Sequence, residues 1–164
     1  MITHIRDATF QDGEAIARIY NHYVVGSAAT FDTEPVSAES RREWVTNRDG
    51  KHPVLVAERD GDVVGWGSIS PWASRPAWHR TVETSVYVRE DVRGEGVGSA
   101  IMEALIDRAR AVGHHVLIAQ IVAGNDASVA MGERMGFVQV GTLCEVGDKF
   151  GRWHDLVLAQ LILE

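Results

Sequence analysis

The chain has 164 residues, 45% of them hydrophobic and 24% charged, which are the proportions of an ordinary soluble globular domain. Its formal net charge of −7 argues against a nucleic-acid partner, because such a partner would need a basic face. No apolar run reaches the length of a membrane span and the N-terminus lacks the apolar region of a signal peptide, so we expect one cytoplasmic domain over residues 1–164 without a membrane partner. The single cysteine, Cys144, excludes an internal disulfide.

The first half of the chain is predicted to form an edge strand, two helices and a β-hairpin. The ranges are a strand over residues 2–6, helices over 13–24 and 38–48, and strands over 54–58 and 63–70. Thr9 and Asp12 resemble a capping pair before the first helix. Asp60-Gly61-Asp62 is a strong hairpin signal between the two strands. A loop rich in aromatic and basic residues follows over 71–80.

The second half alternates strands and helices before it ends in two strands. The ranges are a strand over residues 81–88, a helix ending near 112, a strand over 116–122, a helix from about 125 to 135, and strands over 137–145 and 153–163. The continuous apolar run at 116–122 indicates a buried strand. The order of elements predicts an α/β fold, a mixed sheet with helices on both faces.

A glycine-rich turn joins the strand that ends at Val88 to the helix that follows it. Such a turn exposes backbone N–H groups at the positive end of the helix dipole, which suits a phosphate-bearing ligand. No lysine follows Gly98, which excludes a P-loop, and Ser99 stands where a dinucleotide fingerprint has its third glycine. The structural alternative is a plain strand–helix connection with flexible glycines.

The pattern R-x-x-G-x-G, formed by Arg93, Gly96 and Gly98, resembles the acetyl-CoA pyrophosphate loop of the GNAT superfamily of N-acetyltransferases. Further segments resemble the phosphinothricin acetyltransferase group, which acetylates small amino acids and their phosphinate, sulfone or sulfoximine analogues. These segments are Asn21-His22-Tyr23, Thr33-Glu34-Pro35, Val82 to Val88, Asn125 to Val129 and Gly151 to Asp155. The resemblance covers nearly the whole chain and implies a single GNAT domain whose central sheet is splayed at the cofactor strand.

The resemblance also implies a co-substrate, acetyl-CoA, and the residues that hold it. Backbone groups of Val86, Tyr87 and Val88 would bind the pantetheine arm, and Asn125 would reach the cofactor unless it only caps its helix. The pyrophosphate would lie on the turn made of Arg93, Gly94, Glu95, Gly96, Val97, Gly98 and Ser99. Clustering of Arg89 with Arg93 would supply positive charge in an acidic protein. No metal is expected, since the histidines lack metal-ligand spacing.

Glu83 is the candidate general base, at the point where the phosphinothricin group places a glutamate. A carboxylate helps an ammonium lose its proton before the amine attacks the thioester. A glutamate among the valines of a strand is unexpected without a role, and the alternative is a carboxylate on a solvated face. His79, in the preceding loop, is the weaker candidate for the base.

The expected substrate contacts lie mostly in loops. Arg75 matches the group's arginine that faces the substrate carboxylate, where its planar guanidinium can bind two oxygens. The other candidates are Phe31, Trp72, Trp78 and Ser85. A late motif of the group is matched by Lys149, Trp153, His154 and Asp155, which we expect to support the pocket or a homodimer.

One departure from the family pattern concerns the last helix. Gly132 stands where related enzymes carry a tyrosine or histidine, so a side chain that could protonate the leaving thiolate is missing.

Together, the glycine turn, Glu83 and Arg75 and the family resemblance predict transfer of acetyl from acetyl-CoA to a small amino acid by direct attack in a ternary complex. Two alternatives stay open: an acetyltransferase for a peptide N-terminus or an aminoglycoside, and a non-catalytic acyl-CoA-binding module.

Overall fold

The computed structural model describes residues 1–164 and is built on a seven-stranded sheet with the order β1-β2-β3-β4-β5-β7-β6. The strands are β1 (His4–Asp7), β2 (Val54–Arg59), β3 (Asp62–Pro71), β4 (Thr81–Val88), β5 (Val116–Val122), β6 (Val138–Lys149) and β7 (Arg152–Ile162). The α-helices are α1 (Gly13–Gly26), α2 (Ala38–Thr46), α3 (Val97–Ala111) and α4 (Asp126–Arg134). Only β4 and β5 pair in parallel, so the predicted mixed sheet and element order are confirmed.

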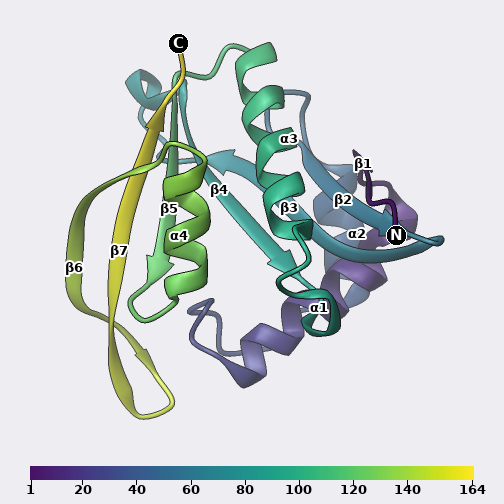
Figure 1. Ribbon diagram of the computed structural model, residues 1–164, viewed down its shortest axis with the longest axis horizontal. Coiled ribbons are helices and arrows are strands. Elements are labelled where there is room, and N and C mark those ends of the chain that lie inside the picture. The colour runs from purple at the N-terminus through teal and green to yellow at the C-terminus, as the bar shows by residue number, and fades with distance from the viewer.

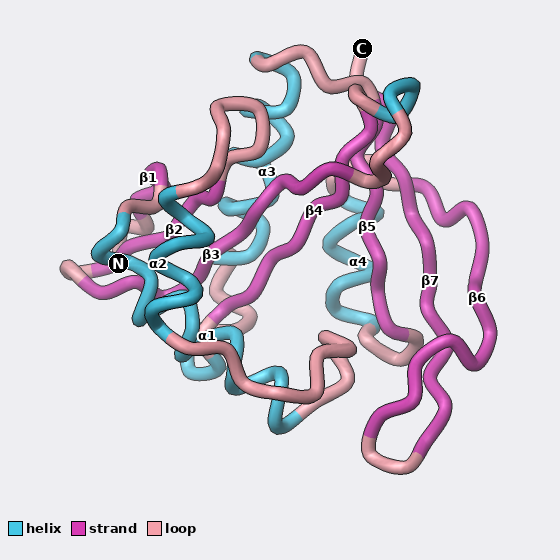
Figure 2. Tube along the Cα trace, turned by 180° about the vertical axis from the view of Figure 1, so that it is seen from behind, coloured by secondary structure: helices cyan, strands magenta, loops and turns pink.

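The helices cover the two faces of the sheet. Helices α3 and α4 lie in front of it in Figure 1, whereas α1 and α2 lie in front in the reverse view of Figure 2. Each face has its own apolar core, with Ile101 and Leu105 of α3 in one and Ile16 of α1 with Trp66 of β3 in the other. This layering follows from helices that bury one apolar stripe against each face of a sheet.

Local signals in the sequence account for several element boundaries. The Ser37 hydroxyl accepts a hydrogen bond from the Ser40 N–H at 3.0 Å and thereby caps α2. Asp12 accepts from the Thr9 N–H at 2.7 Å, but this pair caps a short 3-10 turn, Phe10–Asp12, directly before α1. The hairpin between β2 and β3 turns at Asp60 and Gly61, with φ of 50° and 86°, as the sequence predicts.

The hairpin of β6 and β7 is longer than expected. Strand β6 runs to Lys149 and β7 starts at Arg152, so the turn is only Phe150-Gly151, with φ of 57° and 66°. The pairing register shifts twice along β6, between Gln139 and Gly141 and again between Leu143 and Gly147. These irregularities break the alternation of apolar and polar residues, which is why the pattern indicated a shorter strand.

Strands β4 and β5 separate in their C-terminal halves. Their pairing covers only residues Thr81 to Thr84 of β4 and Val116 to Ala119 of β5, although each strand continues further. The Arg89 N–H donates to the Val64 carbonyl oxygen at 2.8 Å, so the backbone groups of Arg89 point toward β3. Along an antiparallel strand, residues whose backbone groups point toward the neighbouring strand alternate with residues whose groups point away. By that alternation the backbone groups of Val86 and Val88 face away from β3, into the gap. The predicted splay at the cofactor strand is confirmed.

Candidate active site

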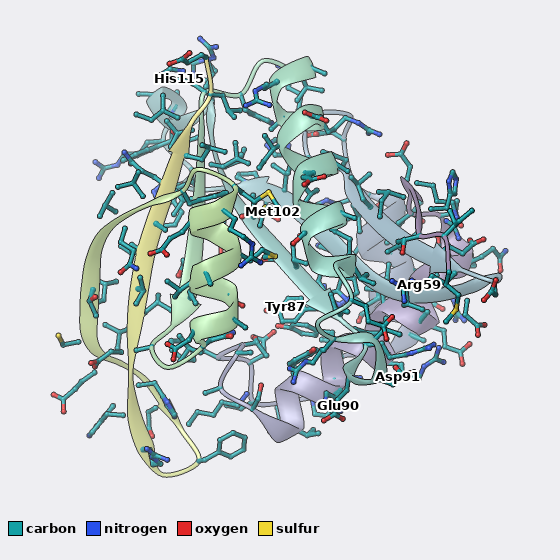
Figure 3. All side chains as sticks on the ribbon, in the orientation of Figure 1. Arg59, Tyr87, Glu90, Asp91, Met102 and His115 are labelled. Carbon is teal, nitrogen blue, oxygen red and sulfur yellow. The ribbon has the colours of Figure 1, made fainter.

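A cavity of about 520 Å³ lies where β4 and β5 separate. Tyr87 of β4 and Met102 of α3, both labelled in Figure 3, line it from two sides. Most of the expected cofactor residues line the same cavity: Val86, Tyr87, Val88, Arg93, Gly94, Gly96, Val97, Gly98, Ser99 and Asn125. The structure therefore brings together backbone from the splayed strand, the glycine turn and the start of α4.

The glycine turn has the backbone geometry that its sequence predicts. Gly94 and Gly96 have φ of 77° and 83°, a region that L side chains rarely adopt, and Gly96 is the N-cap of α3. A Cβ on Gly98 would lie 3.4 Å from the Met131 sulfur and 3.5 Å from a methyl group of Val88. The turn and the first N–H groups of a fifteen-residue helix thus face a cavity large enough for an anionic ligand.

Glu95 is the member of the turn that does not line the cavity. Its carboxylate accepts a hydrogen bond from the guanidinium of Arg59, a β2 residue that is only 8% exposed. Arg59 also donates from Nε to the Thr3 hydroxyl at 2.8 Å. Arg59, labelled in Figure 3, therefore holds the turn on the side away from the cavity. It lies 36 residues earlier in the chain and belongs to no motif that the sequence analysis identified.

Arg93 and Tyr23 form a second support for the cavity wall. The Arg93 guanidinium lies 5.0 Å from the centre of the Tyr23 ring, and its Nε donates to the Tyr23 hydroxyl at 3.1 Å. That hydroxyl donates in turn to the Val88 carbonyl oxygen. Tyr23 of α1 thus links the glycine turn to the end of β4, a role that its sequence position did not reveal.

The expected clustering of Arg89 with Arg93 is wrong. Arg89 forms an exposed ion pair with Asp91 at 2.6 Å and does not line the cavity. The Asp91 carboxylate, two residues away, neutralises it locally and raises the pKa of the Arg89 guanidinium. The second arginine of the cavity is Arg134, in the last turn of α4.

Glu83 does not line the cavity, although the next two residues of β4, Thr84 and Ser85, do. It is half-buried and pairs across the sheet with Ser70 of β3 and Ile118 of β5. Burial raises the pKa of its carboxyl, and the nearby side chain of Gln120, a cavity residue, partly offsets that rise. A carboxyl whose pKa is raised toward neutral pH is better matched to accept a proton from an ammonium. Ser85, the next residue on this face of β4, lines the cavity.

The four loop residues expected to contact the substrate do not line the cavity and belong to loops near the two ends of β4. Phe31 belongs to the loop after α1, which reaches the C-terminal end of β4 near Tyr87. Trp72, Arg75 and Trp78 belong to the loop that precedes β4, where Trp72 is half-buried and the other two are exposed. Glu83 and Ser85 lie between these two groups along the strand. His79 is exposed, with its ring 2.9 Å from the Pro76 carbonyl oxygen.

Three residues of the motif near the C-terminus make hydrogen bonds within the β6–β7 hairpin or from it to the loop after α1. Lys149 is 4% exposed and donates to the Thr30 carbonyl oxygen at 2.8 Å. The His154 ring nitrogen lies 2.9 Å from the Lys149 carbonyl oxygen, and Asp155 accepts from the Glu145 N–H at 2.7 Å. Trp153, in contrast, is 64% exposed.

Two further residues of α4 face the cavity. Asn125 lines it and also caps the helix, accepting from the Ser128 N–H at 3.4 Å. Gly132 lines it as well, and a Cβ there would meet only Phe137, at 3.6 Å, which is an ordinary contact. Packing therefore does not require a glycine at this position.

No cluster of three or more His, Cys, Asp or Glu side chains could hold a metal ion. None of the helices combines the length and the apolar composition that a membrane crossing needs.

Comparison with known proteins gives matches over nearly the whole chain. Residues 15–137 match the model of the acetyltransferase (GNAT) family. The L-methionine sulfoximine/L-methionine sulfone acetyltransferase of Pseudomonas aeruginosa is 43% identical, over 100% of this chain and 96% of its own length.

Two solved structures are similarly close. A phosphinothricin acetyltransferase of the GNAT superfamily from Sinorhizobium meliloti, in complex with acetyl-CoA, superposes with a TM-score of 0.92 at 32% identity, over 99% of this chain and 89% of its own. The ribosomal-protein-alanine N-acetyltransferase of Brucella melitensis superposes with a TM-score of 0.95 at 45% identity, over 98% of this chain and 99% of its own.

Proposed function

The chain belongs to the GNAT family of acetyltransferases, and we propose that its acceptor is the amine of a small amino acid or of a phosphinothricin-like or methionine sulfoximine-like analogue. It is an acetyl-CoA-dependent N-acetyltransferase. The observation that carries this assignment is the cavity between the splayed ends of β4 and β5, bordered by the glycine turn at the start of α3. The acceptor class rests on relatives that are named for amino-acid substrates.

The residues of the cavity fit the parts of acetyl-CoA. Backbone groups of Val86 and Val88 that face the gap can pair with the amides of pantetheine as a neighbouring strand would. The N–H groups of the glycine turn and the start of α3 can bind the pyrophosphate. Arg93 and Arg134 add positive charge on either side of the cavity. Acetyl-CoA supplies the acetyl group as a thioester.

The transfer removes two protons from the nitrogen and exchanges a C–S bond for a C–N bond. We propose that Glu83 accepts the first proton from the substrate ammonium, directly or through water, because its raised pKa suits that step. The free amine then attacks the thioester carbonyl carbon, the C–S bond breaks, and the nitrogen loses its second proton to water as the amide forms. The thiolate of coenzyme A leaves, and Glu83 releases its proton to solvent. With Gly132 in α4, no side chain at that position donates a proton to the thiolate, whose own pKa of about 8.5 allows it to leave unassisted.

A release assay for free coenzyme A tests the acceptor class. The purified enzyme is given acetyl-CoA with methionine sulfoximine, methionine sulfone, phosphinothricin and ordinary amino acids, beside a peptide and an aminoglycoside. Thiol release with one or more of the amino acids, and much less with the other two, is expected. Release of coenzyme A with the peptide or the aminoglycoside alone would contradict the proposal. Tight binding of acetyl-CoA without release of coenzyme A on any acceptor would favour a non-catalytic module.

A peptide N-terminus is the second candidate acceptor, because the Brucella melitensis structure, at 45% identity, is named for ribosomal-protein alanine. The same assay separates the two candidates when the peptide begins with alanine. An alanine peptide preferred over free alanine would identify the chain as a protein-acetylating enzyme.

The proposal includes a homodimer formed through the β6–β7 hairpin. Strand β6 is an unpaired edge twelve residues long, and nearly all of it is exposed. Its exposed apolar side chains include Val138, Val140, Leu143 and Val146. Exposure of a long apolar strand edge to water is unfavourable, so we propose that a second copy of the chain covers β6. Sedimentation of the wild type as a dimer, and of Leu143→Lys as a monomer, is expected; a monomeric wild type would contradict it.

The proposal also includes a cytoplasmic location. Because Cys144 is the only cysteine, no disulfide can form within the chain, so the fold does not depend on an oxidising compartment.

A further inference from the structure

Arg93 is the only acidic or basic residue between positions 89 and 95 that lies beside no side chain of the opposite kind. The others form three pairs: Asp91 with Arg89, Glu95 with Arg59, and Glu90, labelled in Figure 3 beside α1, with His22. Arg93 forms no ion pair, and its side chain makes a single hydrogen bond, from Nε to the neutral hydroxyl of Tyr23. Its positive charge is therefore available to a negatively charged ligand in the cavity that it lines.

Tyr23 is itself held in one position. It is only 5% exposed, and its ring centre lies 5.4 Å from that of Tyr87 on β4. Its hydroxyl donates to the carbonyl oxygen of Val88. Val88 lies beyond Thr84, the last residue of β4 that pairs with β5, so no strand on that side supplies a partner for its carbonyl. The Tyr23 hydroxyl supplies one instead, and this contact fixes the phenol at the separated end of β4.

The single proton of the Tyr23 hydroxyl determines how this group binds Arg93. Because the proton is donated to Val88, the oxygen is left as an acceptor, and it accepts the Nε–H of Arg93 at 3.1 Å. The guanidinium carbon also lies 5.0 Å from the centre of the Tyr23 ring. The two terminal amino groups of Arg93 make no hydrogen bond within the chain, so they can bind two phosphate oxygens at once.

We propose that Tyr23 is a positioning residue for the cofactor, which holds the Arg93 guanidinium beside the cavity without neutralising it. Both residues line the cavity. A carboxylate in the place of Tyr23 would also hold Arg93, but it would cancel the charge that attracts a phosphate group. A guanidinium that is held before the ligand arrives loses less conformational entropy on binding. This inference rests on the proposed function, because it assumes that the pyrophosphate of acetyl-CoA binds at the glycine turn.

The first experiment replaces Tyr23 by phenylalanine, which keeps the ring and removes the hydroxyl. The Kd for coenzyme A, measured by calorimetric titration, is expected to rise about five- to tenfold, as for the loss of one hydrogen bond to a charged group. Tyr20→Phe is the matched control, because the Tyr20 hydroxyl contacts Thr30 and Asp32 and not the glycine turn. In this control the Kd for coenzyme A should change by less than about twofold.

The second experiment asks whether Tyr23 acts through Arg93. Arg93→Met alone should raise the Kd for coenzyme A at least about tenfold, since it removes a charge-assisted contact with phosphate. In the Arg93→Met background, Tyr23→Phe should raise the Kd by less than about twofold more, because the side chain that it positions is gone. A merely structural role, through Val88 and the core, would leave the two effects independent, and they would multiply.

The third experiment compares two acetyl donors, acetyl-CoA and S-acetylpantetheine, which carries the same thioester but no phosphate. The ratio of kcat/KM for acetyl-CoA to that for S-acetylpantetheine should fall about fivefold in Tyr23→Phe, because only acetyl-CoA has the phosphates that Arg93 binds. Damage to the strand at Val88 would lower both values together and leave the ratio unchanged.

If Tyr23→Phe does not fold, Arg93→Lys decides. Arg93 is exposed, and lysine keeps its charge but has no Nε–H beside a planar pair of amino groups. It cannot be held by Tyr23 and bind two oxygens in the same way, so the Kd for coenzyme A should rise about five- to tenfold. Arg89→Lys is the control, since Arg89 pairs with Asp91 and does not line the cavity.

The results that overturn the inference are distinguishable from failure of the proposed function. A wild type that binds coenzyme A, beside a folded Tyr23→Phe variant with the same Kd or with an effect that multiplies with that of Arg93→Met, overturns the role of Tyr23 alone. An Arg93→Lys variant with the wild-type Kd does the same. A wild type that binds neither coenzyme A nor acetyl-CoA overturns the proposed function, and this inference with it.

Discussion

Glu83, the proposed base, is half-buried in an interior strand of the sheet. It pairs with Ser70 of β3, and the next two residues of its strand, Thr84 and Ser85, line the cavity. Burial disfavours the charged carboxylate, which is the physical cause of its raised pKa.

Replacement of Glu83 by glutamine tests its role as base. We expect kcat/KM for the amino acid at neutral pH to fall about 100-fold, the usual contribution of a positioned base. In the wild type the rate should fall as the pH drops through the raised pKa of Glu83, because the protonated carboxyl cannot accept a proton. The variant should lose that acidic limb. An unchanged rate and an unchanged pH profile would exclude Glu83 as the base.

Arg75 is exposed and its side chain makes no hydrogen bond within the chain, although its carbonyl oxygen accepts from the Trp78 N–H, so its guanidinium is free to bind a ligand. Arg75→Ala should raise the KM for amino acids about tenfold, by loss of a charge-assisted pair. The corresponding amines without a carboxylate should be affected much less. Equal KM values for amino acids in wild type and variant would refute a role for Arg75 in carboxylate recognition.

At the scale of elements, the anchoring of the glycine turn by Arg59 gives a prediction about the cofactor alone. Arg59→Met removes the partner of Glu95 behind the turn. Because the Glu95 side chain is 48% exposed, the loss is moderate, and we expect the KM for acetyl-CoA to rise about three- to tenfold. The KM for the amino acid should stay the same. The opposite pattern, a change for the amino acid only, would mean that the turn does not hold the cofactor.

Two glycines, Gly132 in helix α4 and Gly136 just after its end, should respond in opposite directions to alanine. Gly132 is in the helix interior with room for a Cβ, so Gly132→Ala should stabilise the fold by about 1 kcal/mol and raise Tm by about 2–4 °C. Gly136 has φ of 94°, and Gly136→Ala should destabilise it by a similar amount. Thermal unfolding followed by circular dichroism measures both. A Gly132→Ala variant with a lowered Tm would show that glycine is needed there.

Turns that are determined by residues adjacent in the chain could be predicted from the sequence. The Asp60-Gly61 hairpin and the glycine turn before α3 are set by residues adjacent in the chain, and the structure confirms both. The β6–β7 hairpin was predicted too short, because bulges interrupt its alternation. Tyr23 stands in the segment Asn21-His22-Tyr23 that the sequence singled out, but its contact with Arg93, 70 residues away, forms only on folding and could not be predicted from the chain.

At the scale of the whole molecule, the separation of two central strands is the feature that produces the site. Parallel pairing between β4 and β5 ends after Thr84 and Ala119, and the cavity occupies the space that follows. Strands held apart in the middle of a sheet leave backbone groups without partners, which is unfavourable in an empty cavity. A ligand with amide groups of its own, such as the pantetheine arm of acetyl-CoA, satisfies them.

Calorimetric titration of the purified chain with acetyl-CoA is the most direct test of this account. We predict saturable binding of one acetyl-CoA per chain, with a heat that becomes more exothermic as the temperature rises, because apolar surface of the cavity is buried. Measurement at two temperatures ensures that an enthalpy near zero at one of them does not hide binding. Absence of heat at both temperatures would contradict the claim that the gap between β4 and β5 is an acetyl-CoA site.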